Sequence, residues 1–136
     1  MGFFSQFDAK LDEKSRISIP SRFRGQFGSE PAYLTSSEDA CIAVFTKEAF
    51  DKKAIRVQAM GDDTRAGRDA HRKFFGDTDD TVPDAQGRLV LTQRLMTHAG
   101  LKKPCDVLII GAGDWFEVWD PQAYANRNEP PPEQAA

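Results

Sequence analysis

The sequence contains few of the residues from which catalytic and metal sites are built. It has two cysteines and two histidines among 136 residues, and Cys41 and Cys105 belong to no CxxC pair and have no histidine at ligand spacing. This excludes the common zinc motifs, and isolated thiols are typical of a reducing compartment. No serine or cysteine motif accompanies His71 or His98, as a catalytic base would require. We therefore expect no metal, no cofactor and no enzymatic activity.

Long apolar runs, a leader segment and an excess of basic charge are also absent. No apolar stretch approaches the roughly 18 residues of a membrane-spanning helix, and the opening MGFFSQF lacks the basic and apolar regions of a signal peptide. The 18 Lys and Arg against 21 Asp and Glu give a formal net charge of −3. Such a chain attracts phosphate only through a local basic face, and residues 1–27 supply one, with five bases against three acids. We expect a cytosolic protein.

What the sequence does contain is an internal repeat. LDEKSRISIP at 11–20 matches PDAQGRLVLT at 83–92, with Asp12 on Asp84 and Arg16 on Arg88. A second pair of segments, at 33–50 and 107–124, aligns in a register that differs by two residues. Two copies with so long a period do not make a solenoid. We interpret them as two related halves that pack together, because a half of about 50 residues alone buries too little apolar surface.

Both halves predict the same order of short elements: strand, short helix, strand, turn and strand. Period-two alternation indicates strands in RISIP and RLVLT, each preceded by a further strand. Ser21 is a candidate cap for the first short helix, and Gly100 is placed to end the second. The predicted strands and hairpin pairs are SQFDAKL, RISIP and AYLT with CIAVFT in the first half, and DTDDTV, RLVLT and DVLII with WFEVW in the second.

Two longer helices are predicted between the halves. KEAFDKKAIRVQAM and DTRAGRDAHRKFF have helical composition, with a break at Gly61 and a cap at Asp62 or Asp63. Phe50, Ala54, Val57 and Met60 fall on one face of the first. We expect a first half at 5–51, a helical connector at 52–75, a second half at 77–125 and, from the three successive prolines, a disordered tail at 126–136.

The turn DEKSR allows two interpretations. Asp12 and Arg16 are spaced to form a surface ion pair in a solvated turn. Alternatively, the turn presents Lys14 and Arg16 to phosphates and base edges, where the planar fork of arginine makes two parallel bonds. The pattern is compatible with both.

Glycines and aromatic residues near the end of the chain raise two other possibilities. GAGD at 111–114 lacks the further glycine and the following helix of a dinucleotide-binding loop, and WFEVW after it alternates like a strand. A hairpin turn with Gly111 or Gly113 at positive φ is therefore predicted. Trp115, Phe116 and Trp119 indicate either core packing or a subunit interface.

Taken together, these segments resemble the MraZ family of bacterial transcriptional regulators. The resemblance runs from about residue 3 to residue 125 and is carried by FFSQFDAKLDEKSRISIPSRFR, AYLT, VFTKEAF, DAQGRLVL and GAGDWFEVWDPQAY. It implies an α+β fold in which a duplicated swapped-hairpin, AbrB-like β-barrel is formed by two pseudo-symmetric halves in one chain, with connecting helices.

The resemblance also implies a function. Members are cytoplasmic, nucleoid-associated proteins that assemble into ring homo-oligomers. They bind double-stranded DNA at short repeats upstream of their own operon, the division and cell-wall gene cluster, and usually repress it. A ring reconciles the modest charge of one chain with useful affinity, because several weak faces bind several repeats together. The alternative is an oligomeric assembly module that has no enzymatic activity and does not bind DNA.

The DNA-contacting motif of the family is an Asp, three residues and then an Arg. It falls on Asp12 and Arg16 and again on Asp84 and Arg88, with Lys14 at the basic position inside the first copy. Ser15 stands where the family commonly has glycine, so either a positive φ at this position costs energy or the turn has a different shape. Thr92 replaces a common proline and the second loop has no bases, so the first motif is expected to be the main DNA face, with Arg88 as a lesser contributor. The expected DNA-binding residues are Lys14, Arg16, Arg22, Arg24 and Arg88, with Asp12 and Asp84 supporting them.

Overall fold

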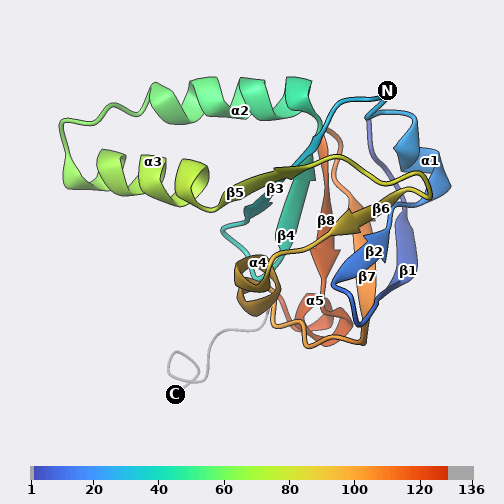
Figure 1. The fold of residues 1–136 in the computed structure, drawn as a ribbon. Helices are drawn as coiled ribbons and strands as arrows, with labels where there is room; N and C mark the ends of the chain where they lie inside the picture. Colours follow the sequence, from blue (N-terminus) through green and yellow to red (C-terminus); the bar gives the residue numbers. More distant parts are fainter. Residues whose placement is uncertain (1, 129–136) are drawn as a thin grey trace, which may run out of the picture.

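The computed structural model describes residues 2–128, which form an α+β fold of eight strands and five helices (Figure 1). The first half contains β1 (Gln6–Leu11), β2 (Arg16–Ser18), α1 (Ser21–Arg24), β3 (Ala32–Ser36) and β4 (Ile42–Phe45). The second half repeats this order as β5 (Thr78–Thr81), β6 (Arg88–Val90), α4 (Gln93–His98), β7 (Cys105–Gly111) and β8 (Trp115–Trp119). The remaining helices are α2 (Lys47–Gln58), α3 (Arg65–Gly76) and α5 (Pro121–Ala125).

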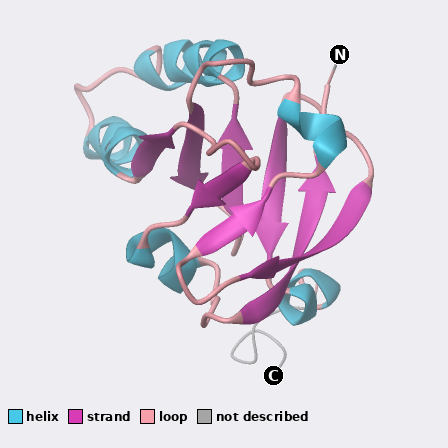
Figure 2. Ribbon diagram, turned by 45° about the vertical axis from the view of Figure 1, so that its right-hand side comes forward, coloured by secondary structure: helices cyan, strands magenta, loops and turns pink. Residues whose placement is uncertain are grey.

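The strands form one antiparallel sheet in the order β5-β3-β4-β8-β7-β1-β2-β6. It curls into a nearly closed barrel (Figure 2). Each strand has a counterpart in the other half: β1 and β5, β2 and β6, β3 and β7, β4 and β8. If the order is read as a circle in which β6 is followed by β5, exchanging all four pairs gives the same neighbours for every strand. This symmetry is expected of a duplicated fold. Side chains link the two edge strands, because Asp79 on β5 accepts from Thr92 and Arg94 just after β6, at 3.3 and 2.8 Å. The predicted fold class is confirmed.

Equivalent residues of the two halves fill the barrel interior. Ile17 and Leu89 lie opposite each other in β2 and β6 and are fully buried. Burial of such side chains contributes about 1.5–3 kcal/mol each, so the halves stabilise one another. An aromatic cluster closes one side of this core, and its rings lie 5.0–6.2 Å apart between Phe3, Phe23, Phe27 and Phe116.

Helices α2 and α3 form a hairpin that extends from the barrel (Figure 1). Phe50 of α2 stacks between Tyr33 of β3, at 4.6 Å, and Phe74 of α3, at 5.1 Å. The hairpin covers the outside of this part of the sheet, which explains why every residue of β4 is buried on both faces of the strand. Met60, at the far end of the predicted apolar face, is 59% exposed.

The helix ends differ in part from the predictions. Thr64, and neither Asp62 nor Asp63, caps α3, because its hydroxyl accepts from the Gly67 N–H at 3.0 Å. Ser21 is not a cap: Pro20 occupies the N-cap position and no side chain accepts a bond there. A proline at this point presets the backbone angle, so α1 begins one residue earlier than the serine-cap pattern suggests.

The turns predicted at Gly100 and Gly113 are confirmed. Gly100 follows α4 with a φ of 68° and ends that helix, and Gly113 supplies the positive φ of the β7–β8 hairpin. No helix among residues 2–128 is both long and apolar enough to span a membrane. The predicted tail begins within a described turn at residues 126–128, and residues 129–136 lie outside the described part.

Candidate nucleic-acid interface

The first turn is organised by one carboxylate. Asp12 Oδ1 accepts from the backbone N–H groups of Lys14 and Arg16, both at 2.9 Å, and Oδ2 accepts from Arg16 Nε at 2.9 Å. The backbone N–H of Arg16 is the largest cause of a lowered pKa at Asp12; desolvation opposes it, and the Arg16 side chain and the Lys14 N–H add to the lowering. Asp12 therefore stays ionised and fixes both the turn and the guanidinium of Arg16.

The second turn has the same geometry 72 residues later. Asp84 Oδ1 accepts from the N–H groups of Gln86 and Arg88 at 2.9 Å, and Oδ2 accepts from Arg88 Nε at 2.8 Å. The backbone N–H of Arg88 is likewise the main cause of a lowered pKa at Asp84. The duplication thus extends to individual hydrogen bonds.

The fourth residue of each turn has a left-handed backbone. Gly87 has a φ of 75°, and Ser15 has a φ of 65°. A side chain at positive φ costs conformational energy. The two possibilities raised by serine in place of glycine are thereby distinguished, because the first turn keeps the shape of the second and Ser15 adopts the unfavourable angle.

Strands β2 and β6 pair directly and carry the two turns at opposite ends of a short ribbon. Arg16 lies opposite Val90, and Arg88 lies opposite Ser18. Reciprocal bonds extend the ribbon, from the Ile19 N–H to the carbonyl of Gly87 and from Leu91 to Ser15, both at 2.7 Å. Because side chains alternate along strands, the outer face of the ribbon presents Arg16, Ser18, Arg88 and Val90.

Both arginines keep binding capacity on this outer face. Their side chains are 27% and 30% exposed for Arg16 and Arg88. Only the Nε of each guanidinium bonds to a carboxylate, and the terminal Nη atoms form no hydrogen bond with any residue in 2–128. From a rise of about 3.4 Å per residue, the two arginines are offset by about 7 Å along the ribbon. The arrangement offers two fixed forks to an anionic or base-edge ligand.

The other predicted arginines lie elsewhere. Arg22 donates to Ser5 Oγ at 3.0 Å and lies 5.1 Å from the ring centre of Phe4, beside the N-terminal segment. Arg24 donates from Nε to the carbonyl of Ile19 at 2.8 Å, and a Cβ added to Gly87 would overlap its side chain. The structure therefore places Arg24 beside the second turn and Arg22 beside the N-terminal segment.

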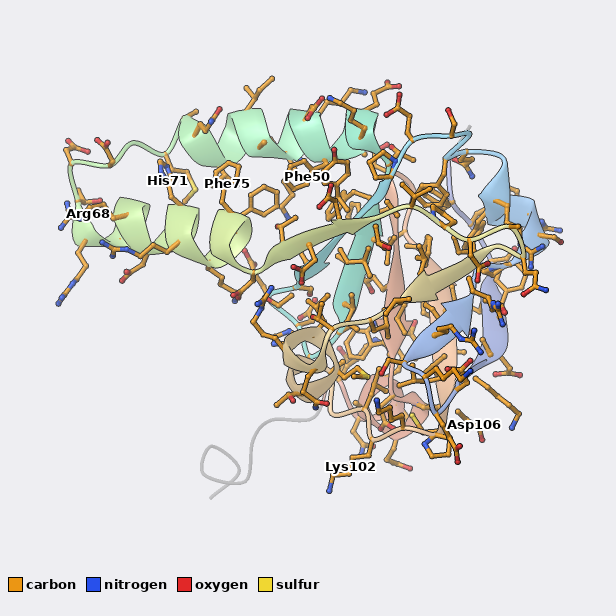
Figure 3. The ribbon with its side chains drawn as sticks, viewed as in Figure 1. Phe50, Arg68, His71, Phe75, Lys102 and Asp106 are labelled. Carbon is orange, nitrogen blue, oxygen red and sulfur yellow. The ribbon has the colours of Figure 1, made fainter. Side chains whose placement is uncertain are left out.

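One basic residue at the first turn was missed by sequence reasoning. Lys103, in the loop before β7, donates to Ser15 Oγ at 2.8 Å. The two residues are 88 positions apart, and the only hint in the sequence is the basic pair Lys102–Lys103 before a predicted strand. Figure 3 shows Lys102 at the end of the barrel away from the α2–α3 hairpin.

The described part of the chain has no comparable arrangement for binding a metal or for nucleophilic catalysis. No group of three His, Cys, Asp or Glu residues is placed to hold a metal. Burial raises the pKa of the Cys41 thiol to about 12, and it also raises that of Cys105. Neither is an activated nucleophile, because nucleophilic cysteines have lowered pKa values.

Comparison with known proteins agrees with this geometry. Residues 3–73 and 74–129 each match the family model described as "MraZ protein, putative antitoxin-like". The chain belongs to the MraZ family. Proteins named "Transcriptional regulator MraZ" are similar over most of their length: that of Micrococcus luteus is 35% identical over 90% of this chain and 83% of the relative, and that of Corynebacterium glutamicum strain R is 34% identical over 93% and 87%.

A third MraZ relative, from Mycobacterium tuberculosis strain H37Ra, is 34% identical over 91% of this chain and 85% of its own. The resemblance inferred from the motifs is confirmed, and two matches of one family model fit the duplicated fold. Relatives carry the name of a regulator and not of an enzyme.

Proposed function

We propose that this protein is a sequence-specific transcriptional regulator that binds double-stranded DNA through the outer face of the β2–β6 ribbon. One observation carries the proposal: a duplicated Asp–Arg turn at each end of a ribbon, with both guanidinium forks fixed and their Nη atoms unoccupied by described residues. A two-stranded ribbon fits the major groove of B-form DNA, where arginine bonds to guanine O6 and N7.

The roles within the site follow from the contacts. Arg16 and Arg88 contact bases or phosphates, Lys14 adds a contact beside Arg16, and Asp12 and Asp84 hold the two turns. Arg24 supports the second turn through the carbonyl of Ile19. The bases at the first turn favour it as the main DNA face, as expected from the motif comparison. Arg22 remains a phosphate contact only if DNA reaches the N-terminal segment.

The finer part of the proposal concerns assembly and target. We infer that the chain acts as a ring homo-oligomer, cytoplasmic and nucleoid-associated, that represses the division and cell-wall cluster by binding repeats upstream of its own operon. Membership of the MraZ family supports this part, as does the need of a chain with a net charge of −3 for several simultaneous contacts. The division into halves at 5–51 and 77–125, connected by 52–75, is supported by their equal element order.

The test is fluorescence anisotropy on a duplex from upstream of its own gene and on a shuffled duplex, over a salt series. Arg16→Ala is expected to weaken specific binding by about 1–3 kcal/mol, the loss typical of one bidentate base contact. A protein that forms oligomers but shows no salt-sensitive DNA binding would instead support the assembly module. Unchanged affinity of Arg16→Ala would remove Arg16 from the site.

A further inference from the structure

Two lysines, Lys14 and Lys103, bring positive charge to the first turn, whereas the cation beside the second turn is Arg24. Lys14 belongs to the turn itself, and Lys102 and Lys103 lie in the loop between α4 and β7. Within residues 2–128 none of these three ammonium groups forms an ion pair. In the second half Gln86 occupies the position of Lys14, and the loop at residues 25–31 has no basic side chain.

Lys103 reaches the first turn through a neutral partner. Its Nζ donates to Ser15 Oγ at 2.8 Å, and Ser15 is only 8% exposed. A hydroxyl carries no charge, so this bond orients the ammonium group without neutralising it. Lys10 is a contrast, because the carboxylate of Asp106 holds its Nζ at 3.0 Å. The charge of Lys103 thus remains available to an anion next to the turn that carries Arg16.

The unfavourable backbone angle of Ser15 indicates that its hydroxyl has a role that glycine could not supply. Ser15 adopts a φ of 65°, an angle at which glycine is less strained. At the equivalent position the second turn has Gly87, where a Cβ would overlap Arg24. Each turn is therefore contacted by a cation that lies outside the turn, but only in the first does a side chain of the turn hold that cation.

We propose that Lys103 binds a phosphodiester of the DNA backbone beside the first turn, and that Ser15 is the residue that positions it. This inference rests on the proposed DNA-binding function. The ligand class follows from the chemistry, since an oriented and uncompensated ammonium next to an arginine fork attracts a phosphate oxygen. The second half thus completes the recognition face of the first.

Salt-dependent anisotropy on the upstream and shuffled duplexes tests this assignment. Lys103→Gln is expected to lower affinity about 3- to 10-fold near 0.1 M salt and to reduce the slope of log K against log salt by about one. The loss should be equal on both duplexes, because phosphate contacts carry no sequence information. Lys103→Arg, which keeps the charge, should retain the wild-type slope.

Ser15→Gly separates positioning from charge. The turn is expected to persist, since Gly87 has the same backbone angle, and thermal unfolding checks this. Affinity should nevertheless fall in the direction of Lys103→Gln, and the double variant should bind no more weakly than Lys103→Gln alone. Lys47→Gln is the matched control, because Lys47 is paired with Asp51 on α2 at 2.8 Å and its loss should leave the salt slope unchanged.

The outcomes distinguish the two levels of the proposal. If Lys103→Gln behaves like Lys47→Gln while Arg16→Ala loses specific binding, the phosphate contact is wrong. If Lys103→Gln weakens binding but Ser15→Gly binds like wild type, Ser15 does not position the lysine. If Arg16→Ala and Lys103→Gln both bind like wild type, the β2–β6 ribbon is not the DNA site. If the wild-type protein shows no salt-sensitive binding to either duplex, the DNA-binding function itself is overturned.

Discussion

At the scale of single residues, one aspartate in each turn performs two tasks at once. Asp12 accepts two backbone N–H bonds, which close the turn, and one bond from Arg16 Nε, which fixes the side chain. Asp84 repeats this pattern with Arg88. An arginine held through Nε has lost much of its rotamer freedom before a ligand arrives, so less entropy is lost on binding. The Asp–x–x–x–Arg spacing in the sequence is what allows one aspartate to close the turn and hold the arginine.

The two aspartates should contribute to the pH dependence of stability. Their pKa values are lowered in the folded state, first by the backbone N–H groups of Arg16 and Arg88. The native state therefore binds fewer protons than the unfolded state near pH 4, so this stabilisation is complete above the unfolded pKa and is lost as the pH falls through the lowered folded values. We expect the melting temperature of Asp12→Asn/Asp84→Asn to lie below that of wild type at pH 7 and to converge with it toward pH 3.

Thermal unfolding of both proteins between pH 3 and pH 7 measures this difference. Asp114→Asn, an exposed acid in the β7–β8 turn, provides a variant with a charge change outside the two motifs. A gap between wild type and the double variant that is independent of pH would contradict the role assigned to the two carboxylates.

At the scale of elements, local pattern was sufficient for some features and insufficient for others. The strand WFEVW and the hairpin turn at Gly113 were predicted correctly, because alternation and glycine geometry are local properties. The predicted cap of α3 was wrong. Asp62, Asp63 and Thr64 are all residue types that cap helices well, and only the residue at which the helix begins decides which of them is the cap.

Contacts between distant segments limited prediction of the candidate site. The β2–β6 pairing that sets the two arginines on one face joins strands 72 residues apart, and no local pattern specifies it. The same holds for Lys103 at Ser15. Arg24 was expected to contact phosphates or to support the loop, and its Nε bonds to the carbonyl of Ile19 beside the second turn. Charge in a sequence does not show which partners the fold brings to a side chain.

The α2–α3 hairpin provides a prediction at this scale. Phe50 lies on the side of α2 that faces α3 (Figure 3) and stacks on Tyr33 and Phe74. Phe50→Ala removes both contacts and is expected to lower the free energy of unfolding by about 2–4 kcal/mol, somewhat less than the roughly 3–5 kcal/mol typical of Phe→Ala because the ring is only half-buried.

Denaturant unfolding measures this loss, with Ile55→Ala on the same helix as the control. Ile55 is 66% exposed, so its truncation should change stability by no more than about 0.5 kcal/mol. Equal effects of the two substitutions would mean that the stacked rings do not hold the hairpin to the barrel.

At the scale of the whole molecule, two nearly equivalent halves carry unequal charge. The strand order is unchanged when the halves are exchanged, and the two turns share each hydrogen bond of the motif. The first end carries Lys14 and Lys103, whereas the second has Gln86 in place of Lys14 and Arg24 beside the turn. In the function proposed here, this difference gives the ribbon a direction on a DNA repeat, with the first end as the more basic one.

One ribbon on an acidic chain should bind weakly by itself, which gives the last prediction. A ring of chains that holds several ribbons at fixed spacing turns each further contact into an intramolecular step, so affinity for a duplex with several repeats should exceed that for a duplex with one repeat by about 10²–10⁴-fold. Sedimentation of the free protein measures the assembly, and anisotropy on the two duplexes measures the gain. A duplex of equal length with one intact and two scrambled repeats controls for non-specific contacts. A monomer in sedimentation, with equal affinity for one and for several repeats, would contradict the ring. An oligomer that shows no gain in affinity for several repeats would mean that its ribbons lie too far apart to bind neighbouring repeats together.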